Sequence, residues 1–148
     1  DKIALISGST AGIGLAIATI LAQEGATVAI NGRKPERVGS AMDKIKQICP
    51  DAKLQGVTAD LSTAVGAELT FQQVPVVDIL VNNLGIYQVK EFGEITDSDW
   101  MDIIETNVMS GVRLSRHYLP LMLQQDWGRI LFISSESAVN IPAEMIHY

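Results

Sequence analysis

The feature that most constrains the fold of this chain is a regular alternation of short apolar runs with segments of helical periodicity. The apolar runs have the length of strands and fall at five places, residues 3–6, 27–30, 54–59, 76–81 and 130–133, of which 54–59 is the weakest. Most are continuous rather than alternating, which is typical of strands buried on both faces of a parallel sheet. This pattern predicts an α/β fold, a doubly wound parallel sheet with helices on both faces.

Each of the first four apolar runs is followed by a segment with the periodicity of a helix. Pro35 suits the first turn of the second helix, and residues 64–73 form a weaker helical segment. Thr96 and Asp99 have the spacing of a capping box before a long helix over 97–123. The predicted apolar stripes are Ile13, Ile17, Ile20 and Leu21 in the first helix, Val38, Met42, Ile45 and Ile48 in the second, and Trp100, Ile103, Ile104, Val108, Leu114, Tyr118 and Leu121 in the long helix.

Composition and charge exclude several classes of protein. The 148 residues are 47% hydrophobic and 19% charged, too apolar for a disordered chain and enough for one buried core. Eleven Lys and Arg against 17 Asp and Glu give a net charge of −6, which argues against a nucleic-acid partner. No apolar run approaches the roughly 18 residues of a membrane span. With Cys49 as the single cysteine and only two histidines, we expect no disulfide, no metal site and a cytoplasmic location.

A glycine-rich segment joins the first strand to the first helix. Gly8, Gly12 and Gly14 follow the spacing G-x3-G-x-G rather than the G-x-G-x-x-G of the general dinucleotide fingerprint. Glycines there allow a tight turn, close approach of a ligand to the backbone and close packing of the helix. The free N–H groups and the dipole of the helix N-terminus favour a pyrophosphate. The segment fits a dinucleotide site, and equally a glycine-rich turn without a ligand.

The end of the second strand bears on which dinucleotide would bind. An acid at this place holds the ribose 2′-hydroxyl of NAD and repels an added phosphate. Here the stretch is Asn31-Gly32-Arg33-Lys34, which contains no acid. Arg33 can pair with a 2′-phosphate through two hydrogen bonds and Lys34 adds charge, so NADP is favoured over NAD. The alternative is a solvated basic turn.

Polar residues also follow the third and fourth strands and interrupt the long helix. Asp60 and the segment 82–85 could hold an adenine edge or a ribose, or could simply cap helices and tie strand ends. Asn107 lies among apolar residues of the long helix. A buried amide needs partners, either protein backbone or a water molecule in an active site.

Two serines and a tyrosine complete the set of candidates. Ser134 and Ser135 follow the fifth strand, where hydroxyls often cap the next helix. Tyr148 would need a nearby positive charge to act as an acid or base at neutral pH. The adjacent His147 is interpreted as a surface or packing residue.

Together these residues resemble the short-chain dehydrogenase/reductase family over the whole range from Lys2 to Tyr148. The glycine segment is similar to the family's cofactor motif, and Asn82-Asn83-Leu84-Gly85 to its N-N-A-G motif with Leu for Ala. Asn107 matches the family's catalytic asparagine. Tyr148 lies 13 residues after Ser135, which matches the family's serine-to-tyrosine spacing and selects Ser135 over Ser134.

The resemblance implies a Rossmann-type sheet with strand order 3-2-1-4-5 and hydride transfer between the nicotinamide of NADP and a carbonyl or alcohol carbon. By the resemblance, Tyr148 moves the proton, Ser135 bonds the substrate oxygen and Asn107 holds a water molecule of the proton relay. The residues expected to contact the cofactor are Gly8, Ser9, Gly12, Ile13, Gly14, Arg33, Asp60, Leu61, Asn83 and Gly85.

Three features depart from the family pattern. Leu84 is bulkier than Ala beside the cofactor, and the link from Asp60 to Asn82 is short. The family's lysine, which lowers the pKa of the tyrosine, lies four residues beyond it and so beyond Tyr148. We therefore expect residues 1–148 to be a single, truncated dinucleotide-binding domain, with a sheet that is incomplete at its C-terminal edge.

The expected function is an NADP-dependent oxidoreductase that acts on a small-molecule carbonyl or alcohol. The alternative is a catalytically inactive regulatory or scaffold protein of the same fold. Residues 86–95 and 136–147 are expected to line part of the substrate pocket, with an apolar wall of Ile86, Tyr87, Val139, Ile141 and Met145. The resemblance implies a homodimer or homotetramer formed through the long helix. We expect neither a membrane nor a nucleic acid as a partner.

Overall fold

Five parallel strands form one sheet in the computed structural model, which describes residues 2–148. Their order is β3-β2-β1-β4-β5, as predicted. The strands are β1 (Ile3–Ile6), β2 (Thr27–Gly32), β3 (Leu54–Thr58), β4 (Ile79–Asn82) and β5 (Arg129–Phe132). The helices are α1 (Gly12–Gln23), α2 (Pro35–Ile48), α3 (Ala64–Gln73), α4 (Asp97–Ile103) and α5 (Ser110–Gln124). Shorter helical turns are η1 (Phe92–Glu94), η2 (Ile104–Met109), η3 (Glu136–Ala138) and η4 (Ala143–Met145).

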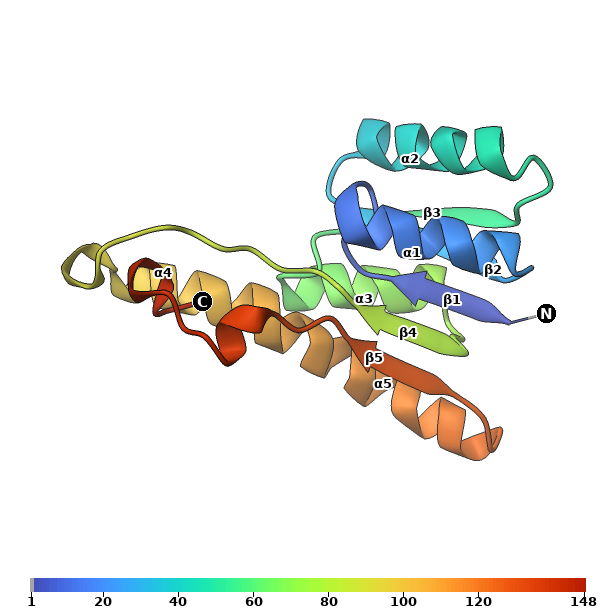
Figure 1. Cartoon of the computed structure of the whole chain (residues 1–148). Helices are drawn as coiled ribbons and strands as arrows, with labels where there is room; N and C mark the ends of the chain where they lie inside the picture. Colours follow the sequence, from blue (N-terminus) through green and yellow to red (C-terminus); the bar gives the residue numbers. More distant parts are fainter. Residues whose placement is uncertain (1) are drawn as a thin grey trace.

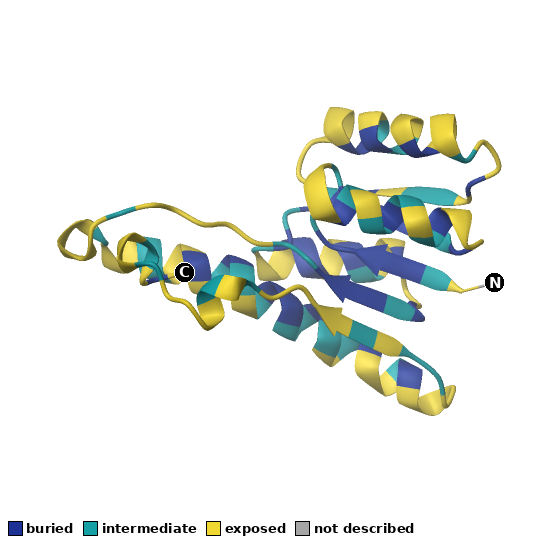
Figure 2. Cartoon of the chain, viewed as in Figure 1, coloured by how far each residue is buried: buried dark blue, intermediate teal, exposed yellow. Residues whose placement is uncertain are grey.

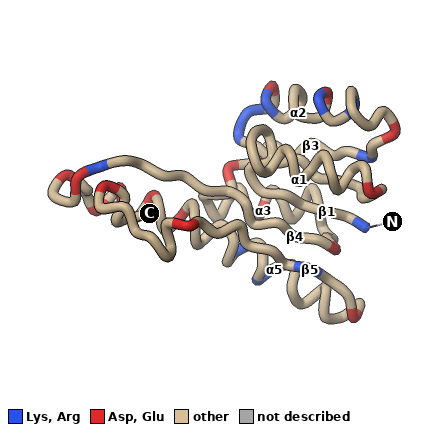
Figure 3. The backbone as a smooth tube through the Cα atoms, in the orientation of Figure 1, with Lys and Arg blue, Asp and Glu red and all other residues tan. Residues whose placement is uncertain are grey.

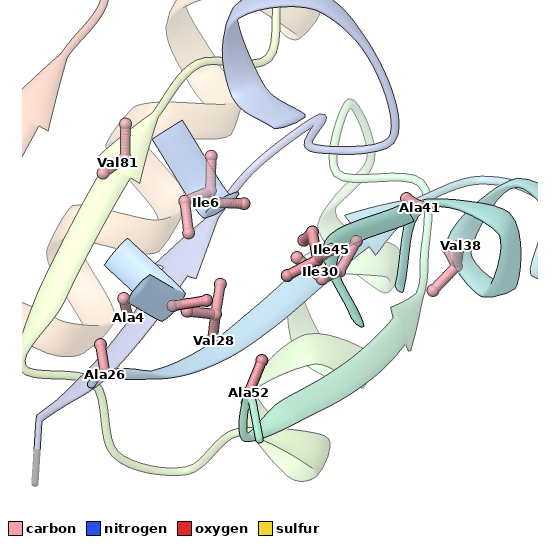
Figure 4. Close-up of a cluster of buried hydrophobic side chains, with 12 residues drawn as sticks. Ala4, Ile6, Ala26, Val28, Ile30, Val38, Ala41, Ile45, Ala52 and Val81 are labelled. Atoms are coloured by element: carbon pink, nitrogen blue, oxygen red, sulfur yellow. The ribbon is translucent and has the colours of Figure 1, made fainter. Parts of the chain in front are cut away.

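Helices cover both faces of the sheet, which confirms the doubly wound α/β fold (Figure 1). Under α1 and α2 lies a cluster of buried aliphatic side chains that includes Ile6 and Ile45 (Figure 4). A second cluster, under α3 and α5, includes Leu5, Leu80 and Tyr118. The neighbours Leu5 and Ile6 thus face opposite clusters, because successive side chains of a strand point to opposite faces.

The sheet-facing side of α1 differs from the predicted stripe. The buried residues are Gly14, Ala18 and Ala22 in α1, and Val38, Ala41 and Ile45 in α2. Ile13 and Ile20 of α1 are exposed, as is Ile48 at the end of α2. Small residues bring the axis of α1 close to the sheet, and the larger aliphatic residues then lie beside the contact. Ile17 and Leu21 of the predicted stripe are partly buried and pack against the cluster under α1, so apolar periodicity located this helix correctly and its packed face in part.

The fourth strand begins later than predicted, and the fifth strand begins one residue earlier. β4 starts at Ile79 rather than Val76, because the preceding residue joins β1 through its side chain as well as its backbone. The Asp78 carboxylate accepts a hydrogen bond from the Ile3 N–H at 2.8 Å, and the Asp78 N–H donates to the Ile3 carbonyl at 2.8 Å. β5 occupies 129–132 rather than 130–133.

β5 is an edge strand with exposed apolar side chains. It pairs with β4 on one side, and α5 packs against it. Phe132 is 60% exposed and Leu131 46%. Figure 2 shows this strand largely exposed, whereas β1 and β4 are mostly buried. The strand therefore presents both an open backbone edge and apolar surface.

The predicted helix over 97–123 consists of three successive segments. α4 and α5 are α-helical, but η2 between them is a π-helix. A π-turn accommodates an extra residue and rotates the following face of the helix. Ile103, Leu114 and Tyr118 are buried as predicted, whereas Ile104 and Val108, within the π-turn, are exposed. The capping box at Thr96 and Asp99 is formed as expected.

Among residues 2–148, no helix is long and apolar enough to cross a bilayer. The same residues contain no group of three or more His, Cys, Asp or Glu side chains that could hold a metal ion. Cys49, at the end of α2, is a free thiol.

Candidate active site

The glycine segment between β1 and α1 adopts a conformation that only glycine takes readily. Gly8 and Gly12 have φ angles of +63° and +55°, in the left-handed region. Gly14 has no room for a side chain, because an added Cβ would lie 2.5 Å from Asn83 Nδ2 and 2.6 Å from the Gly8 carbonyl oxygen. By contrast, nothing lies within 4 Å of an added Cβ at Gly12. The backbone at Gly12 is therefore open to a ligand, as the glycine spacing predicted.

Two polar side chains fasten the glycine segment to the neighbouring strands. The Ser7 hydroxyl accepts hydrogen bonds from the N–H groups of Asn83 and Leu84, both at 2.9 Å. Asn83 Nδ2 in turn donates to the carbonyls of Ser7 at 2.9 Å and Gly8 at 3.1 Å. The Asn83 side chain thus holds the segment together, and its predicted contact with a cofactor would have to use another part of the residue.

Ser9 and Asn31 form a second fastening on the β2 side. Ser9 is fully buried, and its hydroxyl donates to the Ile6 carbonyl at 2.7 Å and accepts from the Asn31 N–H at 2.9 Å. Asn31 Oδ1 accepts from the Gly8 N–H at 3.1 Å, and its Nδ2 donates to the Ala59 carbonyl at 3.1 Å. Asn31 therefore fixes the ends of three adjacent strands. The predicted role of Ser9 in cofactor binding is not available to its hydroxyl, which is engaged inside the protein.

A basic cavity of about 140 Å³ lies at the carboxyl ends of β1, β2 and β3. Its lining residues are Gly8, Thr10, Asn31, Gly32, Arg33, Lys34, Arg37, Ala59, Asp60, Leu61 and Leu84. Three of them are cations, and Figure 3 shows Lys and Arg gathered at the start of α2. The cavity brings together Gly8, Arg33, Asp60 and Leu61, four of the residues predicted to contact a cofactor.

Arg37 is a residue of this cavity that the sequence interpretation missed. It lies in the first turn of α2, four residues after Arg33, and lines the same cavity. Neither guanidinium has an ion-pair partner among residues 2–148. A second arginine four positions after the first was a signal available in the sequence, since residues at that spacing can meet near a helix start.

The Asp60 side chain organises the turn that follows β3. Its Oδ1 accepts hydrogen bonds from the Ser62 hydroxyl at 2.7 Å and the Ser62 N–H at 3.1 Å. Thr63 then caps α3, accepting from the Gly66 N–H at 2.9 Å. Gly66 has no room for a side chain, because an added Cβ would overlap the Asp60 carbonyl. Turn 60–63 thus contributes Asp60 and Leu61 to the wall of the basic cavity.

A main cavity of about 600 Å³ lies beyond the end of β4. It brings together the three predicted catalytic residues, Asn107, Ser135 and Tyr148, from η2, from the segment after β5 and from the C-terminal residue. The cofactor candidates Ile13, Asn83 and Gly85 also line it, as do Leu84, Ile86, Tyr87, Val108, Ile133, Ser134, Ser137, Ala138, Ile141, Met145 and Ile146. Leu84 is common to both cavities.

Asn107 projects from the π-turn and bonds the loop that follows β4. Its Oδ1 accepts from the Ile86 N–H and its Nδ2 donates to the Ile86 carbonyl, each at 2.8 Å. Of the two partners that the sequence left open for this amide, protein backbone is therefore the one observed. The π-turn places the side chain beside the main cavity, where such turns are frequent at functional sites.

Ser135 and Tyr148 approach the main cavity from the segment after β5. The Ser135 hydroxyl accepts from the Ser137 N–H at 3.2 Å and caps η3, so its own hydrogen remains able to donate. The Tyr148 ring packs edge-on against Tyr87, with centroids 6.2 Å apart. His147 is buried against Trp100 rather than on the surface, which confirms a packing position.

The residues of the two cavities fit a dinucleotide that carries a further phosphate. The open backbone at Gly12 and the start of α1 suit a pyrophosphate. The basic cavity offers cationic groups to a further phosphate, and the end of β2 carries no carboxylate. The shared lining residue Leu84 places the two cavities next to each other, so that one extended ligand could enter both.

Comparisons with known proteins place the chain in a family. The sequence model of the short chain dehydrogenase family matches residues 2–148. The chain is 49% identical over 147 residues to the uncharacterized oxidoreductase YvaG of Bacillus subtilis (strain 168). The matched region covers 99% of this chain and 56% of that protein. It is 36% identical over 138 residues to the 3-oxoacyl-[acyl-carrier-protein] reductase FabG of Aquifex aeolicus, covering 90% and 55% of the two chains.

A solved structure agrees with the sequence relatives. L-sorbose reductase from Gluconobacter frateurii, complexed with NADPH and L-sorbose, matches with a TM-score of 0.91 and 32% identity. The match covers 99% of this chain and 57% of that one. The chain thus spans a little over half the length of the relatives it resembles. The family match, the strand order and the glycine segment agree, and the chain belongs to the short-chain dehydrogenase family.

Proposed function

We propose that this chain forms the cofactor-binding and catalytic part of an NADP(H)-dependent oxidoreductase that acts on a carbonyl or alcohol. One observation carries the proposal. A basic cavity and a cavity lined by Asn107, Ser135 and Tyr148 adjoin each other at Leu84. When bound, the dinucleotide would supply or accept the hydride, since no side chain of this chain can do so.

NADP is favoured over NAD by the groups around the end of β2. Arg33, Lys34 and Arg37 line the basic cavity and can neutralise a 2′-phosphate. Gly32 occupies the place where an NAD-binding relative would carry an acid. An added Cβ there would lie 2.5 Å from Thr10 Cγ2, so a carboxylate side chain could enter only if Thr10 moved. The relative L-sorbose reductase, which was crystallised with NADPH, agrees with this preference.

The proposed proton chemistry uses hydroxyl groups of the main cavity. Ser135 retains a hydrogen to donate to the substrate oxygen, because its contact with Ser137 uses it as an acceptor. Tyr148 would give or take the proton as a positioned side-chain acid or base. Asn107 holds the Ile86 backbone, so in this proposal it fixes the loop wall and its remaining lone pair is open to a water molecule.

The proposed substrate has an apolar part beside its carbonyl or alcohol. Ile86, Ile141 and Met145, predicted to form an apolar wall, all line the main cavity, with Ile146 added. Val139, also predicted for that wall, is not among the lining residues and is exposed. Of the relatives, one is named a 3-oxoacyl-[acyl-carrier-protein] reductase and another is an L-sorbose reductase, so both acyl and sugar carbonyls are reasonable probes.

We also propose that residues 1–148 are one dinucleotide-binding domain whose sheet is extended in the whole protein. Exposed Leu131 and Phe132 on β5 support a further covering segment, because apolar strand edges are seldom left open. Exposed Leu119 and Leu123 on α5 support association through this helix into a homodimer or homotetramer. We propose a cytoplasmic location, because the Cys49 thiol is free and thiols stay reduced in that compartment.

The experiment is a fluorescence titration of the full-length protein with NADPH and with NADH. We expect tighter binding of NADPH by about ten- to hundredfold, because hydrogen bonds to a charged phosphate contribute about 1.5–3 kcal/mol. Arg33→Ala should remove most of this preference. Lys44→Ala, an exposed lysine further along α2, should leave it unchanged.

Binding of neither dinucleotide would overturn the proposal. A panel of ketones, sugars and 3-oxoacyl thioesters then tests turnover, and Tyr148→Phe should lower the rate by about 10²–10⁴-fold while NADPH still binds. Dinucleotide binding without turnover of any compound would instead support the inactive alternative.

A further inference from the structure

Arg113 of α5 contacts two segments that border different cavities. Its Nη1 donates to the Ser62 carbonyl at 3.1 Å, and its Nη2 forms an ion pair with the Glu105 carboxylate. Ser62 belongs to turn 60–63, whereas Glu105 belongs to the π-turn η2. The Arg113 side chain is 17% exposed and the Glu105 side chain 40%, so the arginine is mostly buried while the ion pair is partly open to water.

The first of these segments is part of the basic cavity. Asp60 and Leu61 line that cavity, and the Asp60 carboxylate binds the Ser62 N–H and hydroxyl. The Asp60 carboxylate and the Arg113 guanidinium therefore hold the same residue, Ser62.

The second segment is part of the main cavity. Glu105 lies two residues before Asn107 in the same π-turn, and Asn107 binds both backbone groups of Ile86. Residues 83–91 have no helix or strand, and the Asn107 contact anchors the middle of this loop, between the Ser7 contacts of Asn83 and Leu84 and the backbone bond from Lys90 to Glu144. The Glu105 carboxylate thus lies within one turn of the side chain that fixes the wall of the main cavity.

We propose that Arg113 is a positioning residue that couples the basic cavity to the Asn107 turn of the main cavity. The proposal rests on the proposed function, since it takes the basic cavity to hold the adenosine end of the dinucleotide. Arginine suits the role because its planar guanidinium binds two partners at fixed angles. Filling the basic cavity would fix turn 60–63, and through Arg113 would fix η2 and the loop at Ile86. Coupling of this kind requires an element that both sites bias, and the Arg113 contacts supply it.

The test is hydrogen exchange of the full-length protein, measured by mass spectrometry with and without adenosine 2′,5′-bisphosphate. This probe reaches the adenosine end only. In the wild type we expect slower exchange at residues 60–63 and also, by about fivefold, at 86–96 and 104–109. In Arg113→Met, protection should be confined to 60–63. Arg116→Met is the matched control, because Arg116 is exposed on the same helix, and it should behave as the wild type.

Each outcome decides a separate question. Absence of protection at 60–63 in the wild type would overturn the proposed function and this inference with it. Protection at 60–63 that does not extend to 104–109 would overturn the inference alone, as would unchanged long-range protection in Arg113→Met. If Arg113→Met does not fold, Glu105→Gln keeps the Ser62 contact and weakens the ion pair. It should reduce protection at 104–109 and 86–96 while protection at 60–63 remains, and unchanged protection at 104–109 would refute the coupling.

Discussion

Asn107 and Ile86 form a closed pair of hydrogen bonds, in which the amide oxygen accepts from the Ile86 N–H and the amide nitrogen donates to the Ile86 carbonyl, each at 2.8 Å. The side chain thereby satisfies both backbone groups of a residue that has no strand or helix partner. The residue that the family resemblance assigns to a proton relay is thus also a structural anchor of the main cavity.

Asn107→Ala should release the loop at Ile86. Loss of two hydrogen bonds costs about 1–3 kcal/mol locally, so the Ile86 amide should exchange about ten- to hundredfold faster by NMR. Asn140→Ala is the matched control, because this exposed amide donates to the Glu136 carboxylate and, among residues 2–148, forms no hydrogen bond with the Ile86 loop. Equal exchange in the wild type and Asn107→Ala would show that another contact anchors the loop.

Gly14→Ala and Gly39→Ala should change the free energy of unfolding in opposite directions. At Gly14 the new methyl would meet Asn83 Nδ2 and the Gly8 carbonyl, and such crowding costs at least about 1–3 kcal/mol. At Gly39, within α2, nothing lies within 4 Å, and alanine should stabilise by about 0.5–1 kcal/mol. Urea unfolding followed by circular dichroism measures both, and destabilisation of equal size would contradict the steric argument.

Tyr118→Phe should destabilise the fold by about 1–3 kcal/mol, because the buried Tyr118 hydroxyl donates to the Val74 carbonyl at 2.7 Å and phenylalanine leaves that carbonyl unpaired. Tyr87→Phe, at a 71% exposed ring, should change stability by less than about 0.5 kcal/mol. Thermal unfolding of the two variants makes the comparison.

Burial of Tyr118 also predicts a dependence on alkaline pH. Burial raises the pKa of the Tyr118 phenol above its ordinary value near 10. Below pH 10 both folded and unfolded states keep the proton, whereas above pH 10 the unfolded state loses it more readily, so stability falls. Unfolding curves at pH 9 and pH 11 should show a smaller loss in Tyr118→Phe than in the wild type, and an equal loss would count against this cause.

Asp99 should stabilise the start of α4 down to acid pH. Hydrogen bonds from Lys90, at 2.6 Å, and from Thr96 hold the pKa of the Asp99 carboxyl well below its usual range. A lowered pKa adds stability above the unfolded-state pKa near 4, and the gain disappears as the pH falls further. Asp99→Asn should therefore raise hydrogen exchange in α4 at pH 6, and Asp97→Asn, outside the cap contacts, should not. Equal effects of the two variants would mean that charge near the helix start, rather than the cap, is responsible.

Much of the fold could be predicted because the signals were local. Five strand-length runs of mostly apolar residues, separated by helical segments, predicted the sheet. Their burial depends on position in the sheet, because β1, β2 and β4 are largely buried whereas the edge strand β5 is exposed. The fully buried residues of α1 could not be predicted in this way, because Ala18 and Ala22 carry little apolar signal and are buried only through close approach of the helix to the sheet.

The candidate site likewise contains features that the local sequence predicted and features that it could not predict. The glycine spacing predicted an open backbone at Gly12, because the space around a glycine Cα depends on only a few neighbouring residues. The contacts of Asn107 and Arg113 join residues 21 and 51 positions apart, and no local pattern specifies which carbonyl a side chain will meet.

The sequence by itself determined the strands, their order through family resemblance, the glycine turn and the residues able to do chemistry. Those properties follow from periodicity, residue size and backbone freedom, which act over a few residues. Only the tertiary structure decided that Ser9 is engaged internally, that η2 is a π-turn and that Leu84 joins two cavities. These depend on how distant segments pack, because a buried polar group takes whichever partner the packing brings within reach.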